Sequence, residues 1–138
     1  MRILAIETSC DETAISIIDW NKKNGVVKVL ANLVSSQIEV HKPFGGVVPN
    51  LARREHENNL VPILIEALKK ANLISKNSSK IKIGKLNSIL KRESILLEHF
   101  KKEILKLNIP KIDAVAVTYG PGLAPALWVG LNFAKAVS

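Results

Sequence analysis

Apolar and polar residues alternate along the first part of the chain. Two apolar runs, at 2–7 and 14–20, enclose a polar stretch, and a third run covers 26–35 after a turn that contains Gly25. Short apolar runs of this kind, separated by turn residues, are typical of β-strands. The pattern predicts an antiparallel meander of three strands, and the first two form a hairpin.

A loop at 37–48 separates this meander from a helical pattern. Pro43, Gly45 and Gly46 predict that the middle of the loop has no regular structure. Apolar residues then recur at helical spacing, and they are Leu51, Leu60, Leu64, Leu68 and Ala71. Pro62 interrupts this stripe, which predicts a kink that makes the element behave as two short helices.

The segment 75–108 differs in character from its surroundings. It carries nine Lys or Arg residues against three Glu, and its second part, 88–107, has apolar residues near a helical period. We interpret it as a basic insertion with a mobile lead-in followed by an amphipathic helix. After it, 112–118 reads as a buried strand and a largely apolar helix begins near Ala124. The order β-β-β-α-β-α predicts an α/β fold.

Composition narrows the class of protein. A chain of 138 residues with 47% apolar residues fits one domain with a real core. No run approaches the ~20 apolar residues of a membrane helix, and the apolar start is shorter than the ~7 to 15 residues of a signal peptide. Cys10 is the only cysteine, so no internal disulfide can form. These features predict a cytoplasmic protein, and the net charge of +8 favours polyanions such as tRNA.

The predicted hairpin bend, residues 7–13, is dense in carboxylates and hydroxyls. Its sequence is Glu-Thr-Ser-Cys-Asp-Glu-Thr. Small hydroxyl residues let backbone N–H groups approach phosphate oxygens, and Asp11 and Glu12 can hold a cation or its waters. The bend therefore predicts a nucleotide site, and an ordinary polar turn is the alternative that the spacing alone leaves open.

A second candidate lies at 118–123, Thr-Tyr-Gly-Pro-Gly-Leu. A strand, a glycine turn and a helix start can direct free N–H groups at an anion. The P-loop pattern GxxxxGK[ST] is absent, so tight packing of the strand against the helix is the competing explanation for Gly120 and Gly122.

The three histidines raise the question of a metal. His56 and Glu57 begin like the zinc-protease pattern H-E-x-x-H, but Leu60 stands where the second histidine is needed. His41 and His99 have no such partner in the sequence. All three are therefore predicted to be packed or surface residues rather than ligands.

Three stretches together resemble one family. They are IETSCDETAISI at 6–17, HKPFGGVVPNLARREH at 41–56 and IDAVAVTYGPGLAPALWVGLNFAKA at 112–136. In this order they resemble the tRNA threonylcarbamoyladenosine synthase family, known as TsaD in bacteria. The resemblance covers about 1–72 and 112–138, and the basic segment between them matches nothing that we recognise.

The resemblance implies a fold and a reaction. The fold is the amino-terminal lobe of the actin-like ATPases (ASKHA, ribonuclease H-like), in which the first hairpin bend contacts nucleotide phosphates. The reaction transfers a threonylcarbamoyl group from threonylcarbamoyl-adenylate to N6 of adenosine 37 in tRNAs that read ANN codons. The resemblance implies catalytic roles for Asp11 and Glu12, and it implies nucleotide contacts for a further set, namely Ser9, Cys10, Thr13, Gly120 and Gly122.

The resemblance also implies groups that this chain does not supply. A divalent metal, iron or zinc, and the adenine nucleotide are expected to be bound mainly by a carboxy-terminal part, because the family's paired histidines lie beyond Ser138. The chain alone is therefore expected to be an inactive part of a longer sequence. The implied partners are a TsaB-like paralogue, which would bind the helices near Leu60–Leu68 and Leu127–Phe133, and in bacteria a TsaE-like ATPase.

Two other classes of function remain as alternatives. A non-catalytic partner subunit of the same fold would keep the glycine turn and lose the acidic bend. An actin-like small-molecule kinase would transfer phosphate from ATP, and the Gly-Gly-Val-Val-Pro loop at 45–49 disfavours it. The incomplete H-E-x-x-H pattern disfavours a metalloprotease.

Overall fold

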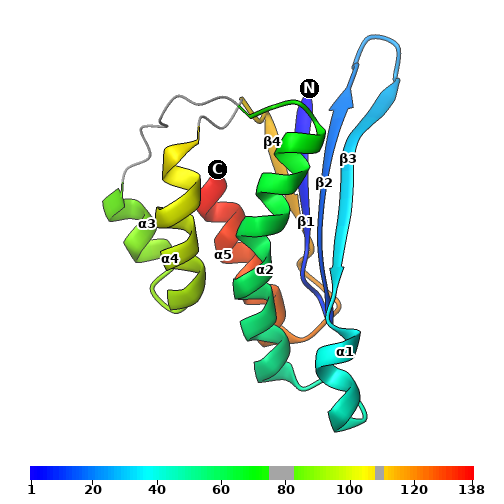
Figure 1. Cartoon of the computed structure of the whole chain (residues 1–138). Helices are drawn as coiled ribbons and strands as arrows, with labels where there is room; N and C mark the ends of the chain where they lie inside the picture. Colours follow the sequence, from blue (N-terminus) through cyan, green and yellow to red (C-terminus); the bar gives the residue numbers. More distant parts are fainter. Residues whose placement is uncertain (75–82, 108–110) are drawn as a thin grey trace.

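A computed structural model describes residues 1–74, 83–107 and 111–138. Four strands form one sheet in the order β3-β2-β1-β4 (Figure 1). They are β1 (Arg2–Glu7), β2 (Glu12–Trp20), β3 (Val27–Ser36) and β4 (Ala114–Val117). The first three pair antiparallel and β4 pairs parallel to β1. The predicted meander and the α/β class are confirmed.

The alternation of side chains gives the sheet two unlike faces. Leu4, Ile6, Ile15 and Ile17 are buried beneath the helices. The intervening positions of β1 and β2, at 5, 7, 14 and 16, are partly exposed on the opposite face. Because successive side chains in a strand point to opposite sides, this period of two commits β1 and β2 to one register.

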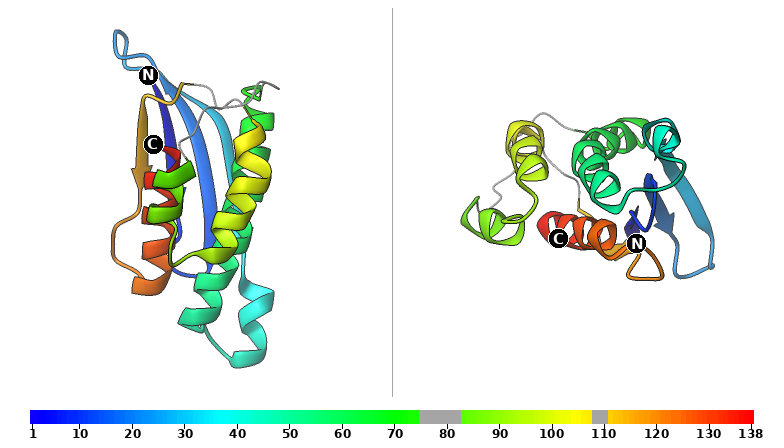
Figure 2. Two further views of the ribbon diagram at one scale, coloured as in Figure 1. Left: turned by 90° about the vertical axis from the view of Figure 1, so that its left-hand side faces the viewer. Right: turned by 90° about the horizontal axis from the view of Figure 1, so that it is seen from below.

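Two layers of helices lie on the buried face. α2 (Pro49–Lys70) packs on β2 and β3, and α5 (Ala124–Val137) packs on β1 and β4. α3 (Ile83–Ile89) packs on α5, and α4 (Ser94–Glu103) packs on α2, so that they form an outer layer (Figure 2). None of the helices in the described ranges is long and apolar enough to cross a membrane.

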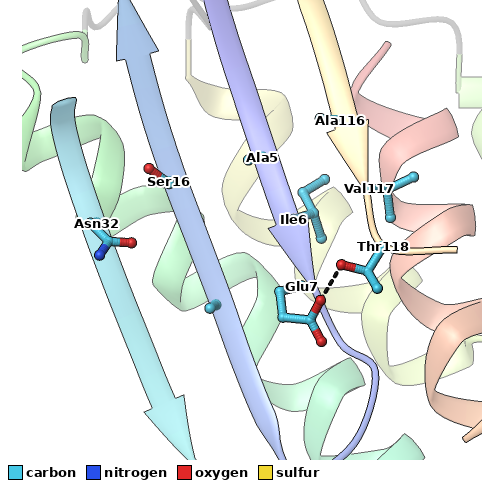
Figure 3. A pocket seen from close by; sticks show the side chains of 9 residues that line it. Ala5, Ile6, Glu7, Ser16, Asn32, Ala116, Val117 and Thr118 are labelled. Carbon is cyan, nitrogen blue, oxygen red and sulfur yellow. Dashed lines mark hydrogen bonds between the residues drawn. The ribbon is translucent and has the colours of Figure 1, made fainter. Parts of the chain in front are cut away.

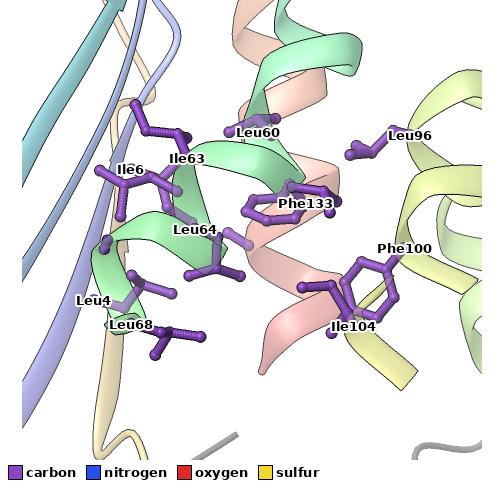
Figure 4. Packing of buried hydrophobic residues seen from close by; sticks show 14 of the residues in the cluster. Leu4, Ile6, Leu60, Ile63, Leu64, Leu68, Leu96, Phe100, Ile104 and Phe133 are labelled. Atoms are coloured by element: carbon purple, nitrogen blue, oxygen red, sulfur yellow. The ribbon is translucent and has the colours of Figure 1, made fainter. Parts of the chain in front are cut away.

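Apolar side chains fill the interface between the sheet and the inner helices, α2 and α5, and the interface between these and the outer helices (Figure 4). Leu64 and Leu68 of α2 are buried against the sheet side, and Phe100 of α4 and Phe133 of α5 meet edge to face with ring centroids 6.2 Å apart. Such aromatic pairs add to the stabilisation from burial alone. The outer helices are therefore part of the core and not an appendage to it.

Several element boundaries differ from the sequence-based expectations. The predicted loop contains a short helix, α1 (Ile38–His41), and a 3₁₀ turn, η1 (Lys42–Phe44). α2 runs through Pro62 as one helix, because burial on both sides outweighs the single backbone hydrogen bond that proline removes. The strand predicted at 112–118 is shorter and only half-buried in the described sheet.

The basic segment also differs in detail. The helix predicted at 88–107 corresponds to α4, followed by a 3₁₀ turn, η2 (Ile104–Lys106), whereas α3 lies mostly in the part expected to be a mobile lead-in. Glu93 and its neighbours form the break between α3 and α4, where Glu93 is buried. Most of the predicted mobile lead-in, at 75–82, lies outside the described residues.

Candidate functional site

The bend between β1 and β2, residues 8–11, is held at three successive carbonyl groups. A different element donates a hydrogen bond to each of them. The bonds are Leu123 N–H to Ser9 O (2.7 Å), His56 Nε2–H to Cys10 O (3.1 Å) and Gln37 N–H to Asp11 O (2.8 Å). The bend cannot rotate without breaking one of them, so the positions of its side chains are fixed from three directions.

His56 is fully buried behind the bend, and its partners decide its tautomer. The carbonyl of Cys10 is an acceptor only, so His56 Nε2 carries the hydrogen. His56 Nδ1 then accepts hydrogen bonds from the Thr13 hydroxyl (2.8 Å) and from Gln37 Nε2 (3.2 Å). Burial lowers the pKa of His56, so the ring is neutral.

A chain of hydrogen bonds extends from this histidine into the glycine-rich loop. His41 Nε2 donates to Gln37 Oε1 (3.1 Å), and the amide of Gln37 donates onward to His56. His41 Nδ1 accepts from the N–H of Val48 (3.3 Å). The loop that ends at Pro49 is therefore coupled to the bend through two buried imidazoles and one amide.

The glycine turn packs directly on the bend. A Cβ at Gly122, whose φ is +154°, would lie 2.5 Å from the carbonyl oxygen of Ser9. A Cβ at Gly130 would overlap the hydroxyl of Thr8, which donates to the carbonyl of Ala126 (3.0 Å). At Gly122, therefore, the turn serves close backbone packing, the competing explanation that the sequence left open.

The two acidic residues lie on the outer side of this arrangement. Asp11 is half-buried and Glu12, the first residue of β2, is exposed. The thiol of Cys10 has a raised pKa because of its burial and because of the neighbouring Asp11. Thr13 is buried with its hydroxyl bound to His56, and Gly120 is exposed with open space around its Cα.

Glu7 is a site residue to which no role was assigned from the sequence. Its Oε1 accepts the N–H of Ser9 (2.6 Å) and its Oε2 accepts the hydroxyl of Thr118, so it bridges the carboxyl ends of β1 and β4 (Figure 3). Burial opposes ionisation of Glu7, but the bonds from Ser9 and Thr118 outweigh it and lower the pKa. Glu7 lines a hollow of about 380 Å³ on the open face of the sheet.

The described residues do not fit a metal ion. They contain no group of three His, Cys, Asp or Glu side chains that could hold one. Both ring nitrogens of His41 and of His56 are engaged by protein groups, and His99 lies half-buried on α4.

Comparison with known proteins gives the family. The sequence model of the family described as TsaD, tRNA N6-adenosine threonylcarbamoyltransferase, matches residues 28–85 and 94–138. The match includes all of the basic segment except 86–93. The chain belongs to this family, and the actin-like lobe expected from the resemblance agrees with the observed sheet order and helices.

Curated relatives extend the match over the bend. Proteins named tRNA N6-adenosine threonylcarbamoyltransferase are 42% identical to the chain over 136 residues in Bacillus thuringiensis, strain Al Hakam, and over 135 residues in Clostridioides difficile, strain 630. A protein of the same name from Caldicellulosiruptor saccharolyticus is 42% identical over all 138 residues. The chain spans 28% to 30% of the length of these relatives.

Proposed function

We propose that the protein transfers a threonylcarbamoyl group from threonylcarbamoyl-adenylate to N6 of adenosine 37 in tRNAs that read ANN codons. Membership of the family supports the reaction. The observation within the chain that carries the proposal is the bend at 8–11, whose three carbonyls are each held by a separate element. Such a rigid bend is what a site needs when catalysis depends on preorganised groups.

Asp11 and Glu12 are the reacting side chains in this proposal. N6 attacks the carbamoyl carbon, the bond from that carbon to the phosphate oxygen breaks, and AMP leaves. One proton must leave N6, and one of the two carboxylates accepts it while the other positions the phosphate or its counter-ion. Ser9, Cys10 and Gly120 complete the proposed nucleotide contacts, and Thr13 and Gly122 are proposed to support the bend from behind.

The wider setting of the reaction is also a proposal. An adenine nucleotide is the donor's leaving group, and a divalent metal, iron or zinc, would be bound mainly by residues outside this chain. A TsaE-like ATPase and a cytoplasmic location follow from the same family likeness. The basic segment, 75–108, is proposed to contain an addition to the family's common lobe at 86–93, the part that the family match leaves out.

Only part of the surface that was expected to bind a TsaB-like paralogue is exposed in this chain. Leu60, Leu64 and Leu68 of α2 are buried within this chain. On α5, Leu127 and Leu131 remain partly exposed beside Tyr119 and line a small hollow with it. We therefore propose that the paralogue contacts this side of α5.

The test is to replace each carboxylate by its amide in the longest product of the gene that carries this sequence. Asp11→Asn and Glu12→Gln keep the size of the side chain and remove its charge. Each is expected to lower the transfer rate about 100-fold or more, since positioned acid–base groups contribute about 10² to 10⁴. The measurement is the radiolabel that passes from threonylcarbamoyl-adenylate to tRNA.

Glu66→Gln is the matched control, because Glu66 is an exposed carboxylate on α2. It is expected to leave both the rate and the far-UV circular dichroism unchanged. The midpoint of urea unfolding should be the same in all three variants. Full transfer activity in both Asp11→Asn and Glu12→Gln would remove these residues from the mechanism.

A further inference from the structure

A second cleft, of about 490 Å³, lies between α2, α5 and the link that joins α3 to α4. Asn50 and Arg53 of α2 lie three residues apart, and Pro125, Trp128 and Asn132 of α5 are spaced by three and four. These spacings place each set on one face of its helix. The end of α3 adds Ser88 and Ile89 to the cleft, and the link adds Lys91, Arg92 and Glu93.

Trp128 is the aromatic wall of this cleft. Its side chain is 56% exposed, whereas Phe133, just over one turn further along the same helix, is fully buried. A large exposed indole in a walled hollow is a surface on which a planar ligand can stack. Stacking of a base on such a side chain contributes about 1–3 kcal/mol and tolerates any base.

Exposed cations lie beside the indole. Arg53 forms an ion pair with the buried Glu57 (3.2 Å) and also donates to the carbonyl of Arg92. Because Glu57 neutralises Arg53, the charge left for an anion comes from Lys91 and Arg92, which are both exposed. Cations beside an aromatic platform are the combination that binds single-stranded nucleic acid.

Glu93 adds an unpartnered acceptor. Only 2% of its surface is exposed, and its Oε1 accepts a hydrogen bond from Asn132 Nδ2 (3.1 Å). Its buried Oε2 has no hydrogen-bond partner among the described residues. A buried acceptor left unpaired is costly, so a ligand that supplies an N–H donor would be favoured. The amino group of cytosine is a donor that glutamate recognises.

We propose that this cleft, the Trp128 cleft, binds one nucleotide of single-stranded RNA. The base stacks on Trp128 and donates its amino group to Oε2 of Glu93, and the phosphate lies against Lys91 and Arg92. The first turn of α5 contributes Pro125 to the cleft and the carbonyl of Ala126 to Thr8 of the bend. The cleft is thus connected through the first turn of α5 to the bend that carries Asp11 and Glu12. The inference rests on the proposed function, because the nucleotide in the cleft would be part of the RNA substrate.

The fluorescence of Trp128 gives a direct test. Trp20 and Trp128 are the two tryptophans of this sequence, so in the 138-residue chain Trp20→Phe leaves Trp128 as the one indole reporter. Titration with a short unstructured RNA is expected to quench its emission to saturation. Trp128→Ala should weaken binding of the same RNA about 10-fold, and Trp128→Phe should weaken it less because a ring remains.

The choice of base tests the role of Glu93. Oligocytidylate should bind more tightly than oligouridylate, because uracil has no amino group. Glu93→Gln should reduce this preference while the circular dichroism spectrum stays unchanged. Lys91→Gln and Arg92→Gln should each lower the slope of log affinity against log salt by about 1.

Several outcomes would overturn the proposal. Emission that RNA leaves unchanged, together with equal affinity in Trp128→Ala, would exclude the cleft as an RNA site. A change in emission that depends on protein concentration without RNA would assign the surface to a second copy of the chain. These results are independent of the proposed reaction, since Asp11→Asn is expected to lower the transfer rate about 100-fold or more and leave the quenching intact.

Discussion

The bend at the carboxyl end of β1 and the helical layers beside it are held by different forces. At the bend, buried carbonyls, imidazoles and hydroxyls pair one to one, as in the bond of His56 to Cys10. In the layers, apolar side chains such as Phe100 and Phe133 pack without directional partners. Hydrogen bonds lose most of their value over a fraction of an ångström, whereas packing responds to volume.

Because of this difference, the helical layers mainly determine the stability of the fold, and the bend mainly determines the geometry of the site. A change in the layers removes stability in proportion to the volume lost, and the site is affected only when the whole fold opens. A change at the bend moves a few backbone atoms and costs less stability, but it shifts the side chains of Asp11 and Glu12. Substitutions in the two regions therefore test the comparison directly.

The largest expected effect is at Phe133. This ring is fully buried and lies between α2, α4 and α5 (Figure 4). Phe133→Ala removes the ring and leaves a cavity, which is expected to lower the free energy of unfolding by about 3–5 kcal/mol. Urea unfolding followed by circular dichroism measures this loss.

Phe44→Ala is the matched control, because Phe44 is 63% exposed in η1. It is expected to change the free energy of unfolding by less than about 0.5 kcal/mol. Similar losses in the two variants would contradict the conclusion that the layers behave as one core.

An intermediate effect is expected at Gly122. Gly122→Ala forces the new Cβ against the carbonyl of Ser9, and overpacking of this kind costs about 1–3 kcal/mol. The transfer rate should fall further than the loss of stability explains, because a shift of Ser9 also moves the neighbouring residues of the bend, including Asp11. The measurements are urea unfolding of the chain and label transfer to tRNA.

Gly120→Ala serves as the control for stability, since a Cβ at Gly120 would have no atom within 4 Å apart from those of its neighbours in the chain. Its free energy of unfolding should stay within about 0.5 kcal/mol of the original chain. If the two alanine variants were equally stable, the close approach of the turn to the bend would not constrain the site.

Periodicity predicted most of the fold because each strand and helix here has one buried face. The alternation at 2–7 and 14–20 gave β1 and β2, and the stripe that includes Leu60 and Leu64 gave α2. The expected division into two short helices at Pro62 was wrong: α2 is one continuous helix, stabilised by burial on two sides that a single stripe does not reveal. At the break between α3 and α4, Glu93 accepts a hydrogen bond from Asn132, which is 39 residues away and which local periodicity does not reveal.

The site was predicted only in part. The density of polar residues at 7–13 identified the bend, since a hairpin alone does not need so many. The supports of the bend, Leu123, His56 and Gln37, come from three other parts of the chain and are brought together only by the tertiary fold. One signal was present in the sequence: His41 and His56 both fall within the second stretch that resembles the family.

The smallest expected effect concerns the pH dependence of His56. Its pKa in the folded chain is below the ordinary value of 6.5, because burial disfavours the charged ring. On acidification the unfolded chain therefore takes up this proton first. The stability that His56 contributes is complete above about pH 6.5 and is lost as the pH falls, by at most about 1.4 kcal/mol per pH unit.

His56→Gln removes this titration and keeps an amide N–H that can donate to the carbonyl of Cys10. The free energy of unfolding of both proteins is measured at a series of pH values between about 7.5 and 5. All other groups titrate in both proteins, so the difference between the two curves isolates His56. The difference should shrink as the pH falls, since only the original chain loses stability at this position. Parallel curves would mean that the imidazole is free to take up a proton in the folded chain, and the hydrogen-bond chain from His41 to the bend would not hold.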